Sequence, residues 1–171
     1  LETVVISANK NETNRMEAPV VVHVMTPKLF ENTNSVCLAQ GLSFQPGLRV
    51  ETNCQNCGFQ QVRINGLDGP YTQLLLDGKA LFSSLNGVYG IEQIPAGMIE
   101  RVEVMRGGGS ALYGANAIGG TVNIITKEPL NNLFMISHNL IAIGNSAYDN
   151  TTSLNASLIN GQRNAGLYIF G

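Results

Sequence analysis

The segment 106–125 is rich in glycine and is the first candidate for a ligand site. Closely spaced glycines let a backbone approach a phosphate group, so a nucleotide site is the enzymatic interpretation to test. The Gly-Lys-Ser/Thr of a P-loop does not follow, and Leu112 stands where a dinucleotide motif needs its last glycine. We therefore interpret the segment as a strand, a tight turn, a helical turn and a second strand.

Cys54 and Cys57 are separated by Gln55 and Asn56. This spacing is compatible with half of a zinc site, with a redox pair or with a small structural disulfide. Zinc would need a second pair of cysteines, and the sequence offers only Cys37 besides these two. A redox motif should open a helix after a strand, whereas this pair lies in a loop rich in Gly and Asn.

The acidic residues and the two histidines form no catalytic pattern. The carboxylates are scattered among the predicted strand ends, and no general base stands beside a nucleophile. His23 and His138 lie in strand-like apolar runs and are expected to be structural histidines rather than haem ligands. We expect no catalytic residue, no metal site and no cofactor.

Composition excludes several partners. The chain has 171 residues, 10 Lys and Arg, 12 Asp and Glu, and a net charge of −2. Binding to nucleic acid requires concentrated Lys and Arg, and the sequence has no such cluster. No apolar run approaches the roughly 18 residues of a membrane-spanning helix. Because the chain begins with Leu and no signal-peptide pattern follows, we expect a processed form or a fragment.

Short apolar runs separated by glycine and proline predict strands in residues 1–128. They are rich in Val, Ile and Leu and have the lengths of strands. The predicted strands cover residues 20–25, 61–64, 73–76, 99–105 and 121–125.

Helix signals are few and short. Asn34 or Ser35 is positioned to cap a helix over residues 36–44. Pro95 is positioned to open a single turn, and residues 110–113 are expected to form another. The sequence therefore predicts a small α+β domain, with short helices packed against a mixed sheet.

Residues 129–171 follow a different pattern, because Asp149 and Arg163 are their only charged residues. Residues 152–159 alternate between an apolar and a mostly polar face. Such segments, separated by turns, suit the antiparallel strands of a transmembrane β-barrel, although a soluble sandwich shows the same alternation. Three strands cannot close a barrel, so a barrel requires a longer parent chain. The three runs are 133–143, 152–159 and 166–170.

Several segments, in this order, resemble the plug-domain signature of TonB-dependent outer-membrane receptors. They are a helix and Pro-Gly turn over 38–50, 58–66 ending in Val-Arg-Ile-Asn-Gly, Leu-Leu-Leu-Asp-Gly at 74–78, Ile-Glu-Arg-Val-Glu-Val-Met-Arg-Gly at 99–107, Ser-Ala-Leu-Tyr-Gly at 110–114, and 117–127. The sequence departs from the family at Gly108, where proline is usual, and at Asn65, where the family's arginine is usually followed directly by glycine.

The resemblance implies a division of the chain into three parts. Residues 1–17 would be an N-terminal segment, 18–128 the plug, and 129–171 the first strands of an incomplete barrel. In this family the plug fills a barrel of about two dozen strands in the bacterial outer membrane. Its N-terminus faces the periplasm, and the barrel contacts outer-membrane lipid.

The resemblance also implies a latch between plug and barrel. Arg63 and Arg106 match the two arginines that pair with barrel-wall glutamates in this family. A guanidinium makes bidentate charged hydrogen bonds, so a few such pairs fix the plug without a covalent link. Glu100, Arg101 and Glu103 would join this cluster. The alternative is that these residues are solvated charges of an ordinary domain.

The N-terminus resembles the TonB box, particularly the form found in cobalamin receptors. A short β-prone segment, kept apart from the core by polar residues 9–15, suits strand addition to the sheet edge of TonB, which acts with the ExbB–ExbD complex. The alternative is a strand of the domain's own sheet. The residues are Glu2, Thr3, Val4, Val5, Ile6, Ser7 and Ala8.

Loops at the plug apex touch the ligand in this family. By position these are residues 53–59 and 79–90, with Gln55, Asn56, Phe82, Asn86 and Tyr89 as candidate contacts. An oxidising periplasm favours the disulfide for Cys54 and Cys57 over the other two interpretations.

The function that follows is active transport of a scarce large ligand across the outer membrane. Ferric siderophore, haem, cobalamin and glycan are all compatible with the sequence. The alternative is a secreted soluble α/β binding module. A nucleotide-using enzyme would require phosphate binding near residues 107–113.

Overall fold

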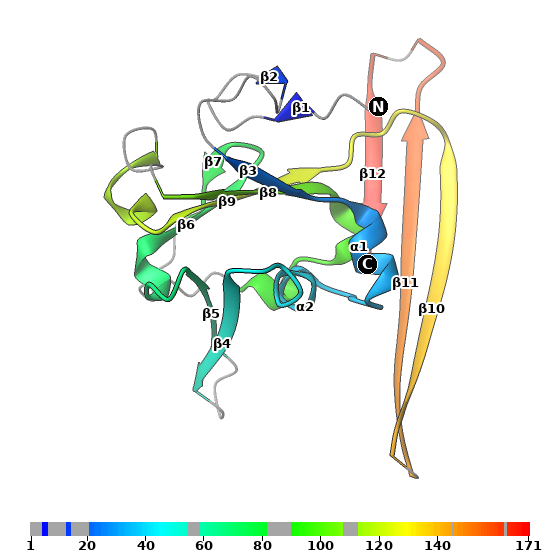
Figure 1. Cartoon of the computed structure of the whole chain (residues 1–171). Helices are drawn as coiled ribbons and strands as arrows, with labels where there is room; N and C mark the ends of the chain where they lie inside the picture. The colour runs from blue at the N-terminus through cyan, green and yellow to red at the C-terminus, as the bar shows by residue number, and fades with distance from the viewer. Residues whose placement is uncertain are drawn as a thin grey trace.

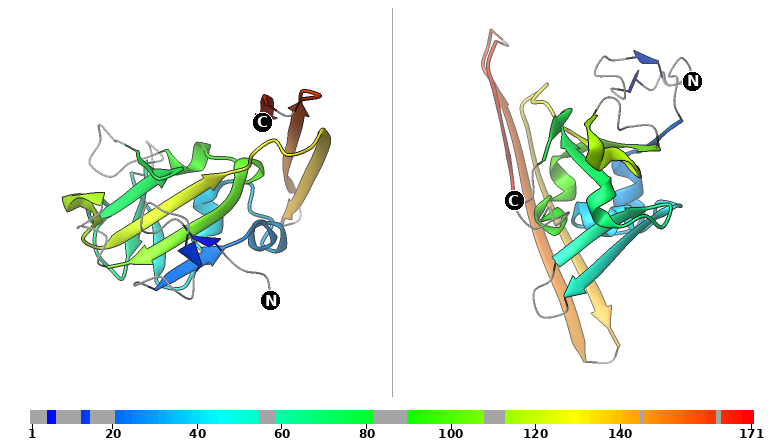
Figure 2. Two further views of the ribbon diagram at one scale, coloured as in Figure 1. Left: turned by 90° about the horizontal axis from the view of Figure 1, so that it is seen from above. Right: turned by 90° about the vertical axis from the view of Figure 1, so that its left-hand side faces the viewer.

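The computed structural model describes residues 5–6, 13–14, 21–54, 59–81, 90–107, 113–144, 146–162 and 164–171. Figure 1 shows a body of short strands and helices with a taller, curved ribbon of three strands beside it. Seen from above, the ribbon stands at one end of the body (Figure 2). The ribbon strands are β10 (Leu133–Ile143), β11 (Ala147–Ile159) and β12 (Gly166–Phe170).

The body is built on a five-stranded sheet with the order β3-β8-β9-β6-β7. β8 pairs antiparallel with β3 and β9, whereas β6 pairs parallel with β9. This confirms the predicted mixed sheet, and all but one of its strands match predicted apolar runs; the short strand β7 was not predicted. The strands are β3 (Val22–Met25), β6 (Thr72–Leu76), β7 (Lys79–Ala80), β8 (Ile99–Arg106) and β9 (Gly120–Thr126).

A separate antiparallel hairpin joins β4 (Leu48–Cys54) to β5 (Phe59–Ile64). β5 matches the predicted run, but the sequence did not predict β4. Gly47, immediately before β4, has a φ of +80°, a left-handed conformation that glycine adopts without strain. The glycine at position 47 therefore allows the tight turn at which the hairpin begins.

Two α-helices lie wholly within the described residues, α1 (Pro27–Asn32) and α2 (Leu38–Leu42). The cap predicted at Asn34 or Ser35 is wrong, because α2 begins two residues after the expected start, with Cys37 in the N-cap position. The Ser35 hydroxyl lies 2.7 Å from the Thr33 hydroxyl instead. The amide of Leu38 donates to the carbonyl of Ile94 at 2.9 Å, so a tertiary contact satisfies the start of the helix.

Four single turns of 3-10 helix lie within the described residues of the body. The turn predicted after Pro95 is confirmed, since the amide of Met98 donates to the Pro95 carbonyl. The turn predicted over 110–113 lies outside the described residues, apart from Tyr113. The turns are η2 (Gly69–Tyr71), η3 (Ile91–Gln93), η4 (Ala96–Met98) and η5 (Ala115–Ala117).

The hydrophobic core lies between the sheet, the two helices and the β4–β5 hairpin (Figure 1). Ile99 and Val104 of β8 and Ile124 of β9 are fully buried in it. Gly41 of α2 lies against the ring of Phe30 from α1, where an added Cβ would overlap the ring. The two helices therefore pack closely because one of them presents a glycine.

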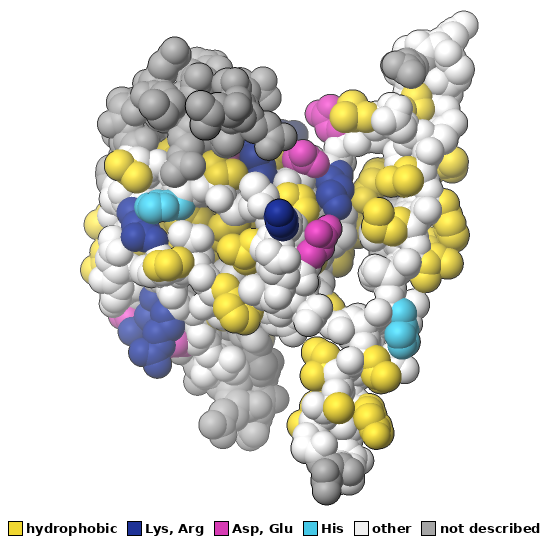
Figure 3. Space-filling view, turned by 45° about the vertical axis from the view of Figure 1, so that its right-hand side comes forward, with side chains coloured by type: hydrophobic (Ala, Val, Ile, Leu, Met, Phe, Trp, Pro, Cys, Tyr) yellow, Lys and Arg dark blue, Asp and Glu magenta, His cyan; other side chains and the backbone are white. Residues whose placement is uncertain are grey.

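The ribbon presents two chemically different faces. Asn155 and Ser157 of β11 are buried toward the body, while Leu154 and Leu158, on the other face, are 40% and 54% exposed. Cross-strand pairing places Ile136 opposite Leu154 on this outer face. Figure 3 shows apolar side chains along the ribbon. The alternation predicted for residues 152–159 is thus present in β11, whose polar residues Asn155 and Ser157 face the body, whereas the same face of β10 also carries Leu133 and Met135. None of the helices in the described part of the chain is long and apolar enough to cross a membrane.

Gly120 is predicted to be intolerant of any side chain. It has a φ of +145°, and an added Cβ would overlap the carbonyl oxygen of Met105 on the neighbouring strand β8. We expect Gly120→Ala to lower the free energy of unfolding by about 3 kcal/mol. Gly107→Ala is the matched control, because Gly107 has a φ of +65° with open space around it. The control substitution should lower the free energy of unfolding by about 1 kcal/mol. Urea unfolding followed by circular dichroism measures both, and equal losses would refute the steric account.

Candidate functional site

Arg63 on β5 is the first of the two predicted latch arginines. Its Nε lies 2.7 Å from Oε2 of Glu51, and its Nη2 lies 2.8 Å from Oδ1 of Asp68. Arg49, directly opposite Arg63 in the register, lies 3.1 Å from the other carboxylate oxygen of Glu51. One carboxylate therefore bridges two facing arginines. Sequence analysis missed Arg49, because only the β4–β5 register brings it beside Arg63.

Arg106 at the end of β8 contacts the turn that begins the hairpin. Its Nη2 donates to the carbonyl oxygen of Pro46. Its guanidinium covers Gly47, where an added Cβ would lie 2.8 Å from Cζ. Arg106 thus joins the central sheet to the β4–β5 hairpin, and a glycine makes the close approach possible.

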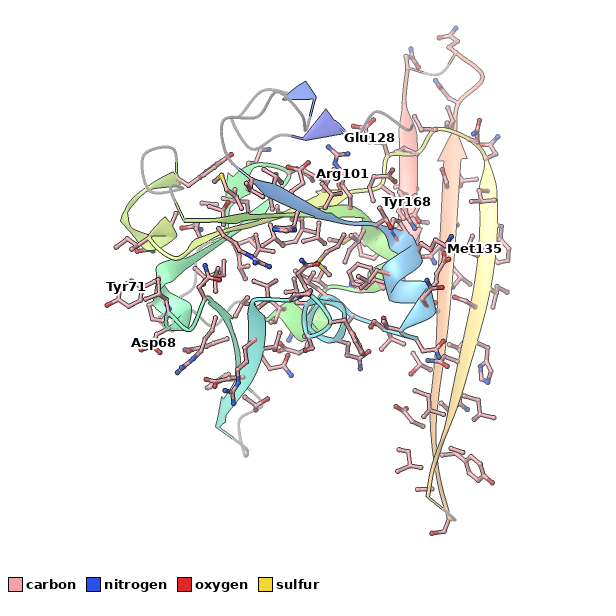
Figure 4. The ribbon with its side chains drawn as sticks, in the orientation of Figure 1. Asp68, Tyr71, Arg101, Glu128, Met135 and Tyr168 are labelled. Atoms are coloured by element: carbon pink, nitrogen blue, oxygen red, sulfur yellow. The ribbon has the colours of Figure 1, made fainter. Side chains whose placement is uncertain are left out.

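The three further cluster residues lie elsewhere on β8. Arg101 Nε donates to Oε1 of Glu103 at 2.9 Å, and Glu103 is only 2% exposed. Glu100 is exposed and lines a cavity near the ribbon. Figure 4 shows Arg101 on the ribbon side of the body and Asp68 on the opposite side. The structure therefore divides the five candidate latch residues between two places.

The cavity lies between the body and the inner face of the ribbon. It has a volume of about 210 Å³, and Tyr168 of β12 is at its edge. The Tyr168 hydroxyl donates to the carbonyl oxygen of Gly97 at 3.1 Å. The lining residues are Glu100, Lys127, Glu128, Leu130, Asn131, Leu133, Met135, Asn155, Ser157 and Tyr168. Sequence analysis found no signal for this contact, because its residues come from distant segments of the chain.

The remaining candidates fall largely outside the described residues. These are Glu2, Thr3, Val4, Ser7 and Ala8 of the box, Gln55, Asn56, Phe82, Asn86 and Tyr89 of the apex loops, Cys57, and the side chain of Cys54. Val5–Ile6 forms the short strand β1, which pairs antiparallel with β2 (Thr13–Asn14). Cys37 is a free, half-buried cysteine. His138 Nδ1 lies 2.9 Å from the Thr152 hydroxyl, so this histidine has a side-chain partner.

The N-terminal strands and the hairpin lie on opposite sides of the body. The β4–β5 hairpin and the β10–β11 connection extend to the same side of the body, whereas β1 and β2 lie on the opposite side (Figure 1). The central sheet therefore lies between the N-terminal strands and the β4–β5 hairpin (Figure 1). The body thus has a hairpin on the side opposite the N-terminal strands and a ribbon of strands at its flank.

The comparisons with known proteins agree. The family model described as TonB-dependent Receptor Plug Domain matches residues 14–121. The vitamin B12 transporter BtuB of Vibrio vulnificus is 35% identical over 127 residues, which are 74% of this chain and 21% of the relative. The chain therefore belongs to the TonB-dependent receptor plug domain family. It spans about a fifth of the length of such relatives.

Solved structures show the same fold. The siderophore receptor PirA of Acinetobacter baumannii is 26% identical with a TM-score of 0.66, over 88% of this chain and 24% of that one. The alcaligin outer membrane receptor FauA of Bordetella pertussis has a TM-score of 0.69 at 18% identity, over 93% and 27%. The second match supports the fold alone. These relatives are named as transporters or receptors and not as enzymes.

Arg63→Ala is expected to lower the free energy of unfolding by about 1 kcal/mol, since it removes two partly exposed ion pairs. The loss should shrink in 1 M NaCl, because salt screens such pairs. Arg49→Ala is the control, as its side chain is 76% exposed, and its effect should be close to zero. Urea unfolding at low and high salt measures both variants. A loss that does not change with salt would contradict the ion-pair account.

Arg106→Ala is expected to loosen the start of the hairpin without unfolding the sheet. The amide of Asn65 donates to the Gly47 carbonyl at 3.1 Å, within the turn that Arg106 covers. Removing the guanidinium should speed exchange of this amide roughly fivefold, the effect of one net hydrogen bond. Hydrogen exchange in the full-length receptor measures it. An unchanged rate at Asn65 would show that Arg106 does not hold the turn.

Proposed function

We propose that the chain is the plug and first wall strands of a TonB-dependent active transporter in the bacterial outer membrane. In this proposal residues 1–17 couple to TonB, 18–128 form the plug, and 129–171 begin the barrel. The observation that carries it is strand β11, which turns Asn155 and Ser157 toward the plug and Leu154 and Leu158 away from it.

The geometry of the ribbon supports a lipid-facing wall. β10 and β11 have 11 and 13 residues, enough for a tilted strand to span the hydrocarbon layer. Their outer face carries large apolar side chains whose exposure to water is unfavourable. In the described part of the chain β10 and β12 are the edge strands of this sheet, and further strands of a closed barrel would pair with their backbone groups. The apolar outer residues are Phe134, Ile136, Leu140, Tyr148, Leu154, Leu158, Leu167 and Ile169.

Arg63 and Arg106 are proposed to hold the plug in the barrel by pairing with wall carboxylates. Arg63 already forms ion pairs with Glu51 and Asp68 of its own domain, and its side chain is 31% exposed. A wall glutamate would therefore join or replace an existing ion pair rather than neutralise an isolated charge. Exchanging one carboxylate partner for another changes the free energy little, so such pairs would allow the plug to move.

The N-terminus is proposed to bind TonB, with ExbB and ExbD supplying energy, from the periplasmic side. Among the described residues, two residue pairs join Val5–Ile6 to Thr13–Asn14. A two-stranded ladder of this size is marginally stable and can exchange for a partner strand. The position of β1 opposite the hairpin tip supports an N-terminus facing the periplasm and an apex facing outward (Figure 1).

Vitamin B12 or a related corrinoid is the proposed ligand. The support is the 35% identity to a protein named vitamin B12 transporter. A ferric siderophore is the second candidate, since receptors named for siderophores share the fold at 26% identity. Binding of cyanocobalamin and of a ferric catecholate to the full-length receptor distinguishes them. Binding of neither would refute both assignments, and a full-length product soluble without detergent would refute the barrel.

Val5→Pro is expected to abolish energy-dependent uptake and leave ligand binding intact, because proline cannot donate to an added strand. Thr13→Pro is the matched control. It breaks the same intrachain ladder from the other side, since Thr13 pairs with Ile6, but leaves the box unchanged. Uptake of radiolabelled ligand by whole cells should persist in the control. Equal loss in both variants would indicate that residues 2–8 act as a strand of the plug itself.

A further inference from the structure

We propose that Gly97 is the seat of the plug on the barrel wall: a single residue of turn η4 on which two wall strands, β11 and β12, converge through Asn155 and Tyr168. The inference rests on the proposed assignment of β10–β12 to the wall. It assigns a positioning role to three residues that the family motifs do not single out.

The first argument is steric. A Cβ added at Gly97 would lie 2.6 Å from Oδ1 and 2.9 Å from Nδ2 of Asn155. The Asn155 side chain is buried, with 8% of the residue exposed, so it has little room to withdraw. Only glycine therefore lets η4 come this close to β11.

The second argument is the hydrogen bond from the neighbouring strand. The Tyr168 hydroxyl donates to the Gly97 carbonyl at 3.1 Å. Tyr168 is paired with Ser157 in the register and so lies on the same inner face as Asn155. Two strands thus contact Gly97: β11 packs the Asn155 side chain against it, and β12 donates a hydrogen bond to it from Tyr168.

The third argument is that η4 connects three parts of the molecule. The amide of Ala96 donates to the Val36 carbonyl before α2, at 2.9 Å. The carbonyl of Met98 accepts from the amide of Lys127, where the chain leaves β9 for the wall, also at 2.9 Å. A displacement of Gly97 would therefore reach both the helical layer and the exit of the sheet.

The fourth argument concerns the surroundings of the contact. The cavity of about 210 Å³ lies beside Tyr168 and is lined by Glu100, Lys127 and Ser157 among others. Ser157 is 4% exposed, and its hydroxyl has no hydrogen-bond partner among the described residues. Leu130, Leu133 and Met135 also line this cavity, so polar and apolar side chains mix there. The body and the ribbon are therefore not packed against each other directly beside Gly97, and the contact at Gly97 sets their spacing at this place.

The test is a compensating pair of substitutions in the full-length receptor. Gly97→Ala should force η4 away from Asn155 and speed exchange of the Met98 and Lys127 amides about tenfold or more. Asn155→Ala in the same molecule removes the overlapping atoms and should return the rates to within about twofold of the unaltered protein. Tyr168→Phe alone should speed exchange roughly fivefold, because it removes one hydrogen bond and keeps the ring.

Gly161→Ala is the matched control, since Gly161 lies in the β11–β12 turn with open space around it and no positive φ. Permeability to a hydrophilic antibiotic too large for diffusion pores gives a second readout. It should rise with Gly97→Ala and return to its original level in the double variant. A mere loss of stability would not be repaired by a second truncation. If Gly97→Ala fails to assemble, assembly of the double variant supports the seat.

Three results would overturn the proposal: Gly97→Ala behaving like Gly161→Ala, a double variant no better than the single one, or an unaltered rate in Tyr168→Phe. Uptake measured in the same strains separates this outcome from failure of the proposed function. Normal ligand uptake with unchanged exchange overturns the seat alone. A receptor that needs no detergent and transports no ligand overturns the proposed function as well.

Discussion

The pairing of β8 with its two neighbours is the interaction on which the rest of the structure depends. β8 lies between β3, which leads back to the N-terminus, and β9, which leads onward to the ribbon. One end of β8 adjoins η4 and the wall contact, and the other ends at Arg106 against the hairpin turn. A single strand therefore lies in contact with β3, with the turn before the β4–β5 hairpin and with the segment that contacts the ribbon.

Much of the fold could be predicted from the sequence, because the sheet strands are short runs of Val, Ile and Leu between glycines. β4 was missed because Arg49, Glu51 and Thr52 give it a polar character, and its pairing with β5 is decided by tertiary structure. The start of α2 was misplaced because a backbone contact with Ile94, and not a side-chain cap, satisfies its first amide. Local signals fail where distant backbone groups perform the capping.

The candidate site could be predicted only where the resemblance supplied residues. Arg63 and Arg106 were found this way, but their partners Glu51, Asp68 and Pro46 were not, since each depends on register or on a turn. Gly97, Asn155 and Tyr168 carry no motif of their own. They meet because the chain leaves β9 and returns along the body as a ribbon, an arrangement that no local pattern encodes.

The parallel pairing of β6 with β9 has a consequence for how the protein folds. The two strands are joined by a crossover from residue 77 to residue 119, and β3 pairs with β8 from still farther away in the chain. Non-local contacts of this kind form slowly, because loop-closure entropy is lost before they are gained. During synthesis the chain cannot complete this sheet until Thr126, the last residue of β9, has been added. The sheet is therefore complete only when β9, its last strand in the chain, has been synthesised.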